Sequence, residues 1–165
     1  EEGIKPNSIT FVIILGTCSG GGLFHESQSY FKAMSKTHGI VPTLEHYTCM
    51  VSLFGCAGYF DKIISVIKEM PSLDYPAVWL TLLSACEKWG NLKLGKLAFD
   101  QAIQLDNSCG AAYILMADIF LGAGMQDEAR IVDAMRMKYA ACLEQERRLW
   151  IDTYRNVSSF SLGTP

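Results

Sequence analysis

The chain repeats one helical phrase four times, at a spacing of about 34 residues. Each phrase opens on an aromatic residue and has a glycine eleven residues later; the aromatic residues are Phe11, Tyr47, Trp79 and Tyr113, and the glycines are Gly22, Gly58, Gly90 and Gly124. The steps between the aromatic residues are 36, 32 and 34 residues. A period in this range is typical of solenoids built from stacked helix pairs, which serve as binding surfaces more often than as catalysts.

Each phrase has the apolar spacing of an amphipathic helix. Counted from the aromatic residue, apolar residues recur three, four and seven positions later in all four units, as Ile14, Leu15 and Cys18 do in the first. This is the stripe of a helix with one buried face. The glycine suits the left-handed conformation that ends many helices, and a second helix is expected after it, over about 24–36, 60–69, 92–104 and 126–138. We therefore predict an all-α fold, an α-solenoid of about four helix-turn-helix hairpins.

Composition and charge narrow the classes of function. Half of the 165 residues are hydrophobic and 19% are charged, so we expect order over most of the length. No apolar run reaches the 18 or more residues of a membrane span, and we predict no membrane partner. The net charge of −3 argues against strong binding of nucleic acid by this chain alone, because nucleic-acid-binding domains are usually basic. The first residue is Glu1, and we interpret the chain as a fragment of a longer protein.

The segments that close the repeats carry a resemblance to a known family. The letters G-I-K-P-N over 3–7 and G-I-V-P-T over 39–43 bracket the first unit. They resemble the closing residues of the pentatricopeptide repeat. A long repeat, a short repeat ending in E-M-P (69–71) and two divergent repeats resemble the C-terminal part of the plant PLS subclass, in which two extension motifs follow the last repeats. The phrase A-V-W-x-x-L-L-S-A-C over 77–86 is similar to that subclass, and the resemblance covers about residues 3–138.

The resemblance implies a division of the chain into repeats. We expect the end of a preceding repeat (1–7), a long repeat (8–43), a short repeat (44–75), a first extension repeat (76–109), a second extension repeat (110–143) and a tail (144–165). In the tail, two short β-type runs surround Arg155 and Asn156, and this pattern predicts a β-hairpin. In the family a segment of this kind leads towards a DYW deaminase domain. The hairpin here would be either a solvated surface element or a partner-docking one.

The sequence has no catalytic or metal-binding motif that we recognise. A zinc nucleotide deaminase needs H-x-E and P-C-x-x-C, and neither occurs; His25 and Glu26 are adjacent, which is the wrong spacing. Phosphate-binding and dinucleotide fingerprints are also absent. We interpret the three histidines as surface or packing residues, and the six cysteines as reduced structural thiols in preference to disulfides. We therefore expect no enzyme, no cofactor, no metal and no small-molecule substrate.

The resemblance implies modular recognition of single-stranded RNA. In the family one repeat reads one base, through the fifth residue of its first helix and the last residue of the repeat. By motif these pairs are Val12 with Thr43 and Thr48 with Tyr75, and Asn7 closes a preceding repeat. Val12 can pack under a base but cannot hydrogen-bond its edge, and Tyr75 stands where Asp or Asn is usual. Thr48 is the one fifth residue that fits the family's code.

The extension repeats lack this chemistry. Leu80 with Cys109, and Ile114, offer no donor and acceptor pair suited to bases. Three hypotheses remain. The chain is an RNA-binding part of a site-specificity factor for C-to-U editing in a mitochondrion or chloroplast. Alternatively, residues 76–165 are a protein-interaction module that docks a deaminase domain or an editing cofactor. The third is a tetratricopeptide-like scaffold with no role in RNA.

Overall fold

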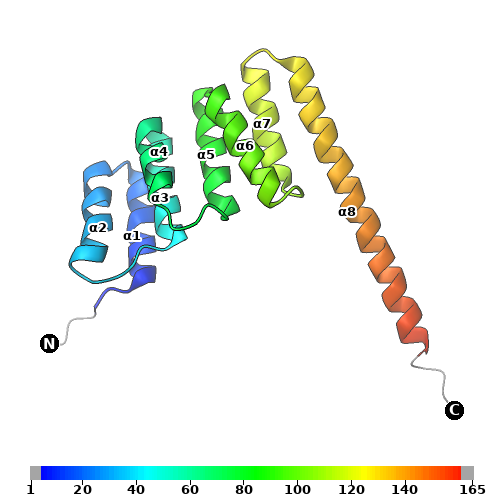
Figure 1. The fold of residues 1–165 in the computed structure, drawn as a ribbon, viewed down its shortest axis with the longest axis horizontal. Helices are drawn as coiled ribbons and strands as arrows, with labels where there is room; N and C mark the ends of the chain where they lie inside the picture. The colour runs from blue at the N-terminus through cyan, green and yellow to red at the C-terminus, as the bar shows by residue number, and fades with distance from the viewer. Residues whose placement is uncertain (1–4, 161–165) are drawn as a thin grey trace.

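This computed structural model describes residues 5–160, which contain eight α-helices joined by turns (Figure 1). They form four consecutive pairs and no strand occurs in this range, which confirms the all-α fold of four hairpins. The pairs are α1 (Ser8–Gly21) with α2 (Phe24–Lys36), α3 (Leu44–Ala57) with α4 (Phe60–Lys68), α5 (Pro76–Trp89) with α6 (Leu92–Leu105), and α7 (Gly110–Gly122) with α8 (Gln126–Phe160).

The repeated glycines end the first helix of three pairs. Gly58 has φ of +74° and is the C-cap of α3, where its N–H caps the carbonyls of Phe54 and Gly55. Gly22 and Gly90 end α1 and α5 in the same left-handed conformation. A side chain at such a φ is strained, so glycine lets the chain turn at once into the second helix.

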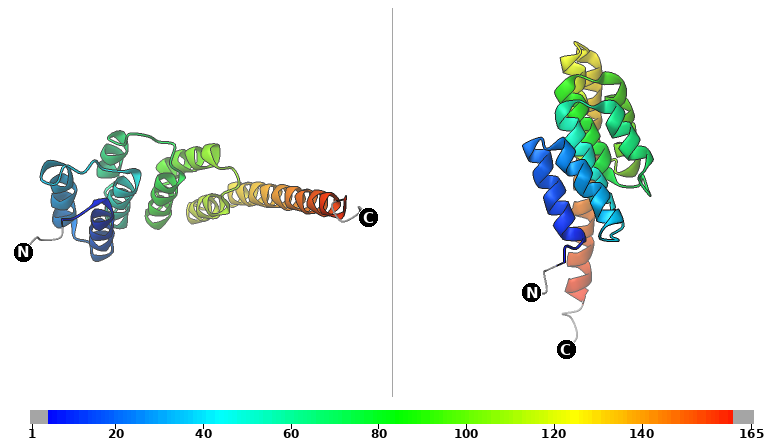
Figure 2. Two further views of the ribbon diagram at one scale, coloured as in Figure 1. Left: turned by 90° about the horizontal axis from the view of Figure 1, so that it is seen from below. Right: turned by 90° about the vertical axis from the view of Figure 1, so that its left-hand side faces the viewer.

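The helices lie in two layers. The first helices pack side by side in chain order, α1 on α3, α3 on α5 and α5 on α7, and each second helix packs against the first helix of its own pair. The left view of Figure 2 shows these two rows. The repeated apolar positions fill the space between them; Leu15, Val51, Leu83 and Met116 are at most 1% exposed. This burial supports the solenoid, since each pair buries its apolar face against its neighbours.

The predicted β-hairpin in the tail is wrong, because α8 continues as one helix to Phe160. No glycine or proline occurs between Met125 and Leu162 to break it. Glu144 also supports this part of the helix, through Arg147 at 2.8 Å and Arg148 at 3.3 Å. Residues 161–165 of the predicted tail lie outside the described residues. The helix α8 runs back along α7 and then projects past the start of α7, away from the layers (Figure 1).

Two of the cysteines, each seven residues after the aromatic residue of its unit, are buried. Cys18 is 4% exposed and Cys86 is fully buried, and both are free thiols. Burial raises the pKa of the Cys86 thiol to about 12, so it stays protonated at neutral pH. Within residues 5–160, no helix combines the length and the apolar character needed to cross a membrane.

Candidate functional site

Three rows of accessible residues run across the layer of first helices. The fifth residues of these helices form one row, and the ninth and thirteenth residues form two more, because positions four apart share a helix face. The rows are Val12, Thr48, Leu80 and Ile114; Gly16, Ser52, Ser84 and Asp118; and Gly20, Cys56, Lys88 and Gly122. None of these twelve residues is buried. We call this surface the inner face.

The other predicted recognition residues are all N-caps of first helices. Asn7 caps α1, Thr43 caps α3 and Tyr75 caps α5. The last residue of each repeat therefore lies at the start of the next repeat's first helix. That helix packs against the first helix of the repeat that the residue closes. The structure thus brings each predicted pair, Val12 with Thr43 and Thr48 with Tyr75, to one junction between neighbouring first helices.

Capping of α1 uses part of the hydrogen-bonding capacity of the Asn7 side chain. Its Oδ1 accepts from the backbone N–H and from the hydroxyl of Thr10, both at 2.9 Å. The side-chain amide N–H groups of Asn7 are not used in these bonds, so Asn7 can still donate to a ligand. The residue is exposed.

Thr43 is held by a histidine whose role the sequence reasoning did not identify. His46 is fully buried, and its Nδ1 accepts from the Thr43 N–H at 3.1 Å and lies 2.8 Å from the Thr43 hydroxyl. Because Nδ1 accepts, Nε2 carries the proton and donates to the carbonyl of Ser8 at 2.9 Å. The Thr43 hydroxyl donates to Glu45, and this bond lowers the pKa of the Glu45 carboxyl. The spacing Thr43-x-x-His46, with a capping residue three positions before a side chain that reaches back, is the signal that could have found it.

Thr48 and Tyr75 have less freedom than the resemblance implies. The Thr48 hydroxyl donates to the Leu44 carbonyl at 2.8 Å, so in this rotamer its oxygen is left as an acceptor. Tyr75 is half-buried and its ring packs against the core. Val12 is half-buried and apolar, and it offers a packing surface.

Two grooves open beside the apolar fifth residues of the last two pairs. Leu80 lines a groove of about 380 Å³ between α3 and α5, together with Ser52, Cys56, Thr81, Ser84 and Lys88. Ile114 lines one of about 400 Å³ between α7 and α8, together with Asp118, Leu121, Arg130 and Asp133. The first has a polar wall of hydroxyl groups, whereas the second has an apolar floor and charges of both signs.

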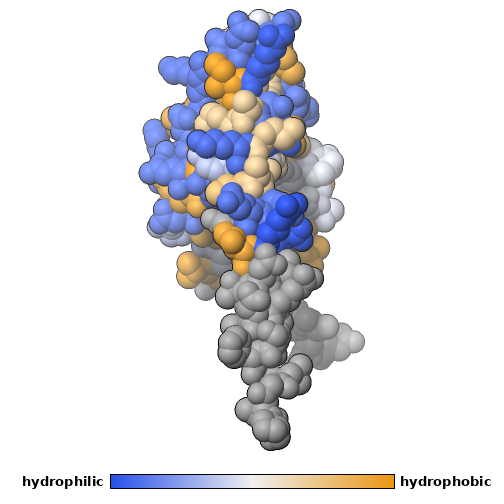
Figure 3. Space-filling model, turned by 90° about the vertical axis from the view of Figure 1, so that its right-hand side faces the viewer, coloured by the Kyte–Doolittle hydropathy of each residue, from blue (hydrophilic) through white to orange (hydrophobic). Residues whose placement is uncertain are grey.

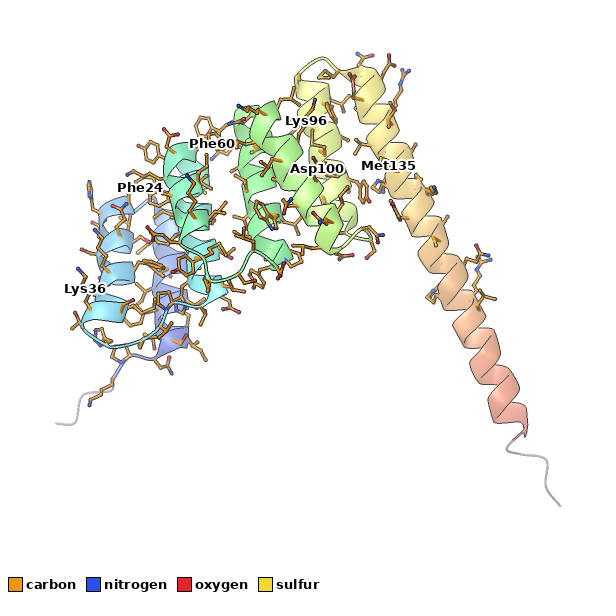
Figure 4. The ribbon with its side chains drawn as sticks, in the orientation of Figure 1. Phe24, Lys36, Phe60, Lys96, Asp100 and Met135 are labelled. Atoms are coloured by element: carbon orange, nitrogen blue, oxygen red, sulfur yellow. The ribbon has the colours of Figure 1, made fainter. Side chains whose placement is uncertain are left out.

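Positive charge lies mainly on the second helices. Among the first helices Lys88 is the one cation, against Glu45, Glu87 and Asp118. Lysines project instead from the second layer, as Lys36 and Lys96 do in Figure 4. Since cationic side chains supply much of the affinity for phosphate, the inner face attracts a nucleic acid weakly. Within residues 5–160, no group of three or more His, Cys, Asp or Glu side chains is placed to hold a metal ion.

The end of the array carries exposed apolar side chains on α8. Ile131 is 61% exposed and Met137 is 57% exposed. Figure 3 shows apolar residues running along this end face between hydrophilic ones. The opposite side of α8 packs on α7 through Val132 and Tyr139, whose ring lies 5.8 Å from that of Tyr113.

Comparison with known proteins gives a consistent set of relatives. The pattern of the PPR repeat family matches residues 45–75, which cover α4 and all of α3 except its first residue. Pentatricopeptide repeat-containing protein At2g21090 of Arabidopsis thaliana is 36% identical over 162 residues, which are 97% of this chain and 27% of the relative. The plant's pentatricopeptide repeat-containing protein CRR2, chloroplastic, is 35% identical over 159 residues, 96% of this chain and 24% of the relative. Pentatricopeptide repeat-containing protein At5g40410, mitochondrial, of the same plant is 37% identical over 137 residues, which are 82% of this chain and 22% of the relative. The chain thus spans about a quarter of the length of these relatives.

Proposed function

Because the chain belongs to the pentatricopeptide repeat family, we propose that it is part of an organellar protein that binds single-stranded RNA. The protein would direct C-to-U editing, or another RNA-processing step, to a chosen site. Its relatives carry chloroplastic and mitochondrial names, which supports an organellar location. The long and short repeats followed by two divergent ones support placement in the PLS subclass.

The observation that carries the proposal is the row of fifth residues on the inner face. Val12, Thr48, Leu80 and Ile114 are accessible and lie on successive packed helices, with the capping residues at the junctions between them. A single strand laid along this row meets one position per repeat, and an unstacked base can hydrogen-bond there on its Watson–Crick edge. We assign base contacts to Thr48 with Tyr75 and to Val12 with Thr43, and one to Asn7 from a preceding repeat.

A second candidate function is protein docking by residues 76–165. The apolar fifth residues Leu80 and Ile114 lie in grooves, and α8 exposes Ile131 and Met137. Exposed apolar side chains in such an arrangement mark interaction surfaces. A deaminase domain or an editing cofactor fits this surface, and the two functions are compatible in the whole protein.

Substitution of Thr48 tests whether the short repeat reads a base. We expect Thr48→Asn to change the preferred base at one position of the RNA by at least about fivefold in relative affinity, because an amide presents both a donor and an acceptor. The measurement is a titration of the 165-residue chain with single-stranded RNAs that differ at one position, repeated at several salt concentrations. Thr37→Asn is the matched control, since Thr37 is the exposed C-cap of α2 and lies away from the inner face.

Two outcomes of this titration contradict RNA reading. An unchanged base preference would remove Thr48 from recognition. A dissociation constant weaker than about 100 μM at low salt, with no dependence on salt concentration, would overturn RNA binding by this chain and favour the docking function.

A further inference from the structure

Trp89 is the last residue of α5, and its side chain contacts one residue of the groove between α3 and α5. Its indole N–H donates to the carbonyl of Gly55 at 2.8 Å, and Gly55 also lines that groove. The side chain is nevertheless 50% exposed. Trp79, by contrast, is 4% exposed and donates to the carbonyl of Leu73. Trp89 is therefore a fixed tryptophan with half of its surface open.

One face of the Trp89 ring lies against the turn after α3. A Cβ atom added to Gly58 would lie 3.1 Å from both Cδ2 and Cε2 of the indole and 3.4 Å from Nε1. Nearly equal distances to three ring atoms place Gly58 over the plane of the indole and not at its edge. The turn after α3 thus covers one face of the ring, while half of the Trp89 surface stays exposed. A flat aromatic face held in one orientation can stack on a nucleobase at low cost in conformational entropy.

Lys88 places its ammonium over this ring in a cation–π contact. Its Nζ donates to the carbonyl of Cys56 at 2.9 Å and lies 5.4 Å from the centroid of the indole. That bond uses one of the three N–H donors of the ammonium. Within the described residues Lys88 forms no ion pair. Its remaining donors are therefore available to a phosphate next to a base stacked on Trp89.

The lining of the groove favours RNA over an acidic peptide. Ser52, Thr81 and Ser84 bring hydroxyl groups to the groove, and Lys88 is its one charged residue. A peptide selected for acidic side chains would need several cations, whereas stacking supplies affinity for a single strand without them. Hydroxyl groups can also bond the edges of a base or a ribose 2′-OH. The cation and the hydroxyl groups line one groove, and the indole bonds Gly55, which also lines it.

We propose that Trp89 is a stacking platform for one nucleobase of the bound RNA, with Lys88 contacting the adjacent phosphate. The inference rests on the proposed RNA-binding function. It adds a base contact to the first extension repeat, whose fifth residue Leu80 cannot hydrogen-bond a base. The RNA would leave the row of fifth residues along the groove and end against the indole.

Fluorescence and substitution together test this platform. In the Trp150→Phe chain, which retains Trp79 and Trp89, a single-stranded 12-nucleotide RNA should quench the emission of Trp89. A further Trp89→Phe change identifies that signal by its loss. We expect Trp89→Ala to weaken binding of the same RNA by about fivefold or more, and Lys88→Gln to reduce the slope of log affinity against log salt by about one.

Trp89→Phe separates stacking from a purely structural role. Phenylalanine keeps a flat ring but loses the hydrogen bond to Gly55, as alanine does. If stacking matters, Trp89→Phe keeps most of the affinity; if both variants lose it equally, Trp89 acts by holding the turn and the platform is overturned. If Trp89→Ala does not fold, quenching in the chain that retains Trp89 still tests whether a base stacks on the indole. An RNA that binds without quenching Trp89 overturns this inference alone, whereas no RNA binding by the unaltered chain overturns the proposed function itself.

Discussion

At the scale of single residues, a buried imidazole joins the first two repeats. His46 belongs to α3, yet its Nε2–H bonds the carbonyl of Ser8 in α1 at 2.9 Å, while its Nδ1 accepts from Thr43. Within the described residues, no buried side-chain nitrogen or oxygen lacks a hydrogen-bond partner. Losing the imidazole would take a hydrogen-bond partner from the Thr43 N–H and from the Ser8 carbonyl at this junction.

His46→Ala should therefore destabilise the chain strongly. We expect the free energy of unfolding to fall by about 2–4 kcal/mol, since the change opens a cavity and strips partners from Ser8 and Thr43. Urea unfolding followed by circular dichroism measures it. His25→Ala is the matched control, because His25 is exposed on α2 and should change stability by less than about 0.5 kcal/mol. Equal effects of the two substitutions would contradict the buried hydrogen bonds of His46.

For single residues, the sequence predicted which positions are buried but not which hydrogen bonds they form. The apolar spacing identified buried positions such as Leu15 and Cys18, because a helical period places them on one face. It did not show that His46 bonds across to α1, since hydrogen-bond partners 38 residues apart depend on how the repeats pack. It also did not show that the Thr48 hydroxyl bonds its own helix. The assignment of base contacts to Thr48 and its companions stays a prediction.

At the scale of elements, the paired helices were predictable and the end of α8 was not. In the pairs, the glycines at left-handed φ and the 3.6-residue apolar period both predict a helix that ends at a tight turn. Packing between neighbouring helices then stabilises this structure. In the tail, Trp150, Tyr154 and Val157 are four and three residues apart, a helical spacing within a segment short enough to be taken for two strands. With no turn-forming glycine or proline at Arg155 and Asn156, the helical spacing and the ion pairs of Glu144 prevail.

A proline in the projecting part of α8 tests this correction. Gln145 is an exposed residue in the interior of the helix. Gln145→Pro should lower the helical ellipticity at 222 nm, because proline removes a backbone hydrogen bond and clashes with the preceding turn. The urea midpoint of the array should stay unchanged, since α8 packs on α7 through residues before this point. Gln145→Ala, which keeps the helix, is the control. Unchanged ellipticity in the proline variant would contradict a continuous α8.

At the scale of the whole molecule, stability depends on how closely neighbouring repeats approach. The first helices pack in chain order, so the stability of the array is about a sum of terms for each repeat and each interface. Gly55 lies at the interface of α3 with α5, where an added Cβ would be 2.9 Å from the Cβ of Ala85. That atom is fixed directly to the α5 backbone, so a side chain at Gly55 would force one helix to move. At Gly95 the near atom, at 2.8 Å, is the flexible end of Ile119, which can turn aside.

Gly55→Ala and Gly16→Ala should therefore have opposite effects on the array. Both glycines lie inside helices, where alanine is favoured by about 1 kcal/mol, and an added Cβ at Gly16 would meet nothing within 4 Å. We expect Gly16→Ala to raise the free energy of unfolding by up to about 1 kcal/mol, and Gly55→Ala to lower it by about 1–3 kcal/mol as α3 and α5 separate. Urea unfolding measures both, and hydrogen exchange should show faster exchange across α3 and α5 in the Gly55 variant. If Gly55→Ala stabilises the chain as Gly16→Ala does, the second and third repeats do not approach closely, and the groove between them that leads to Trp89 has a different shape.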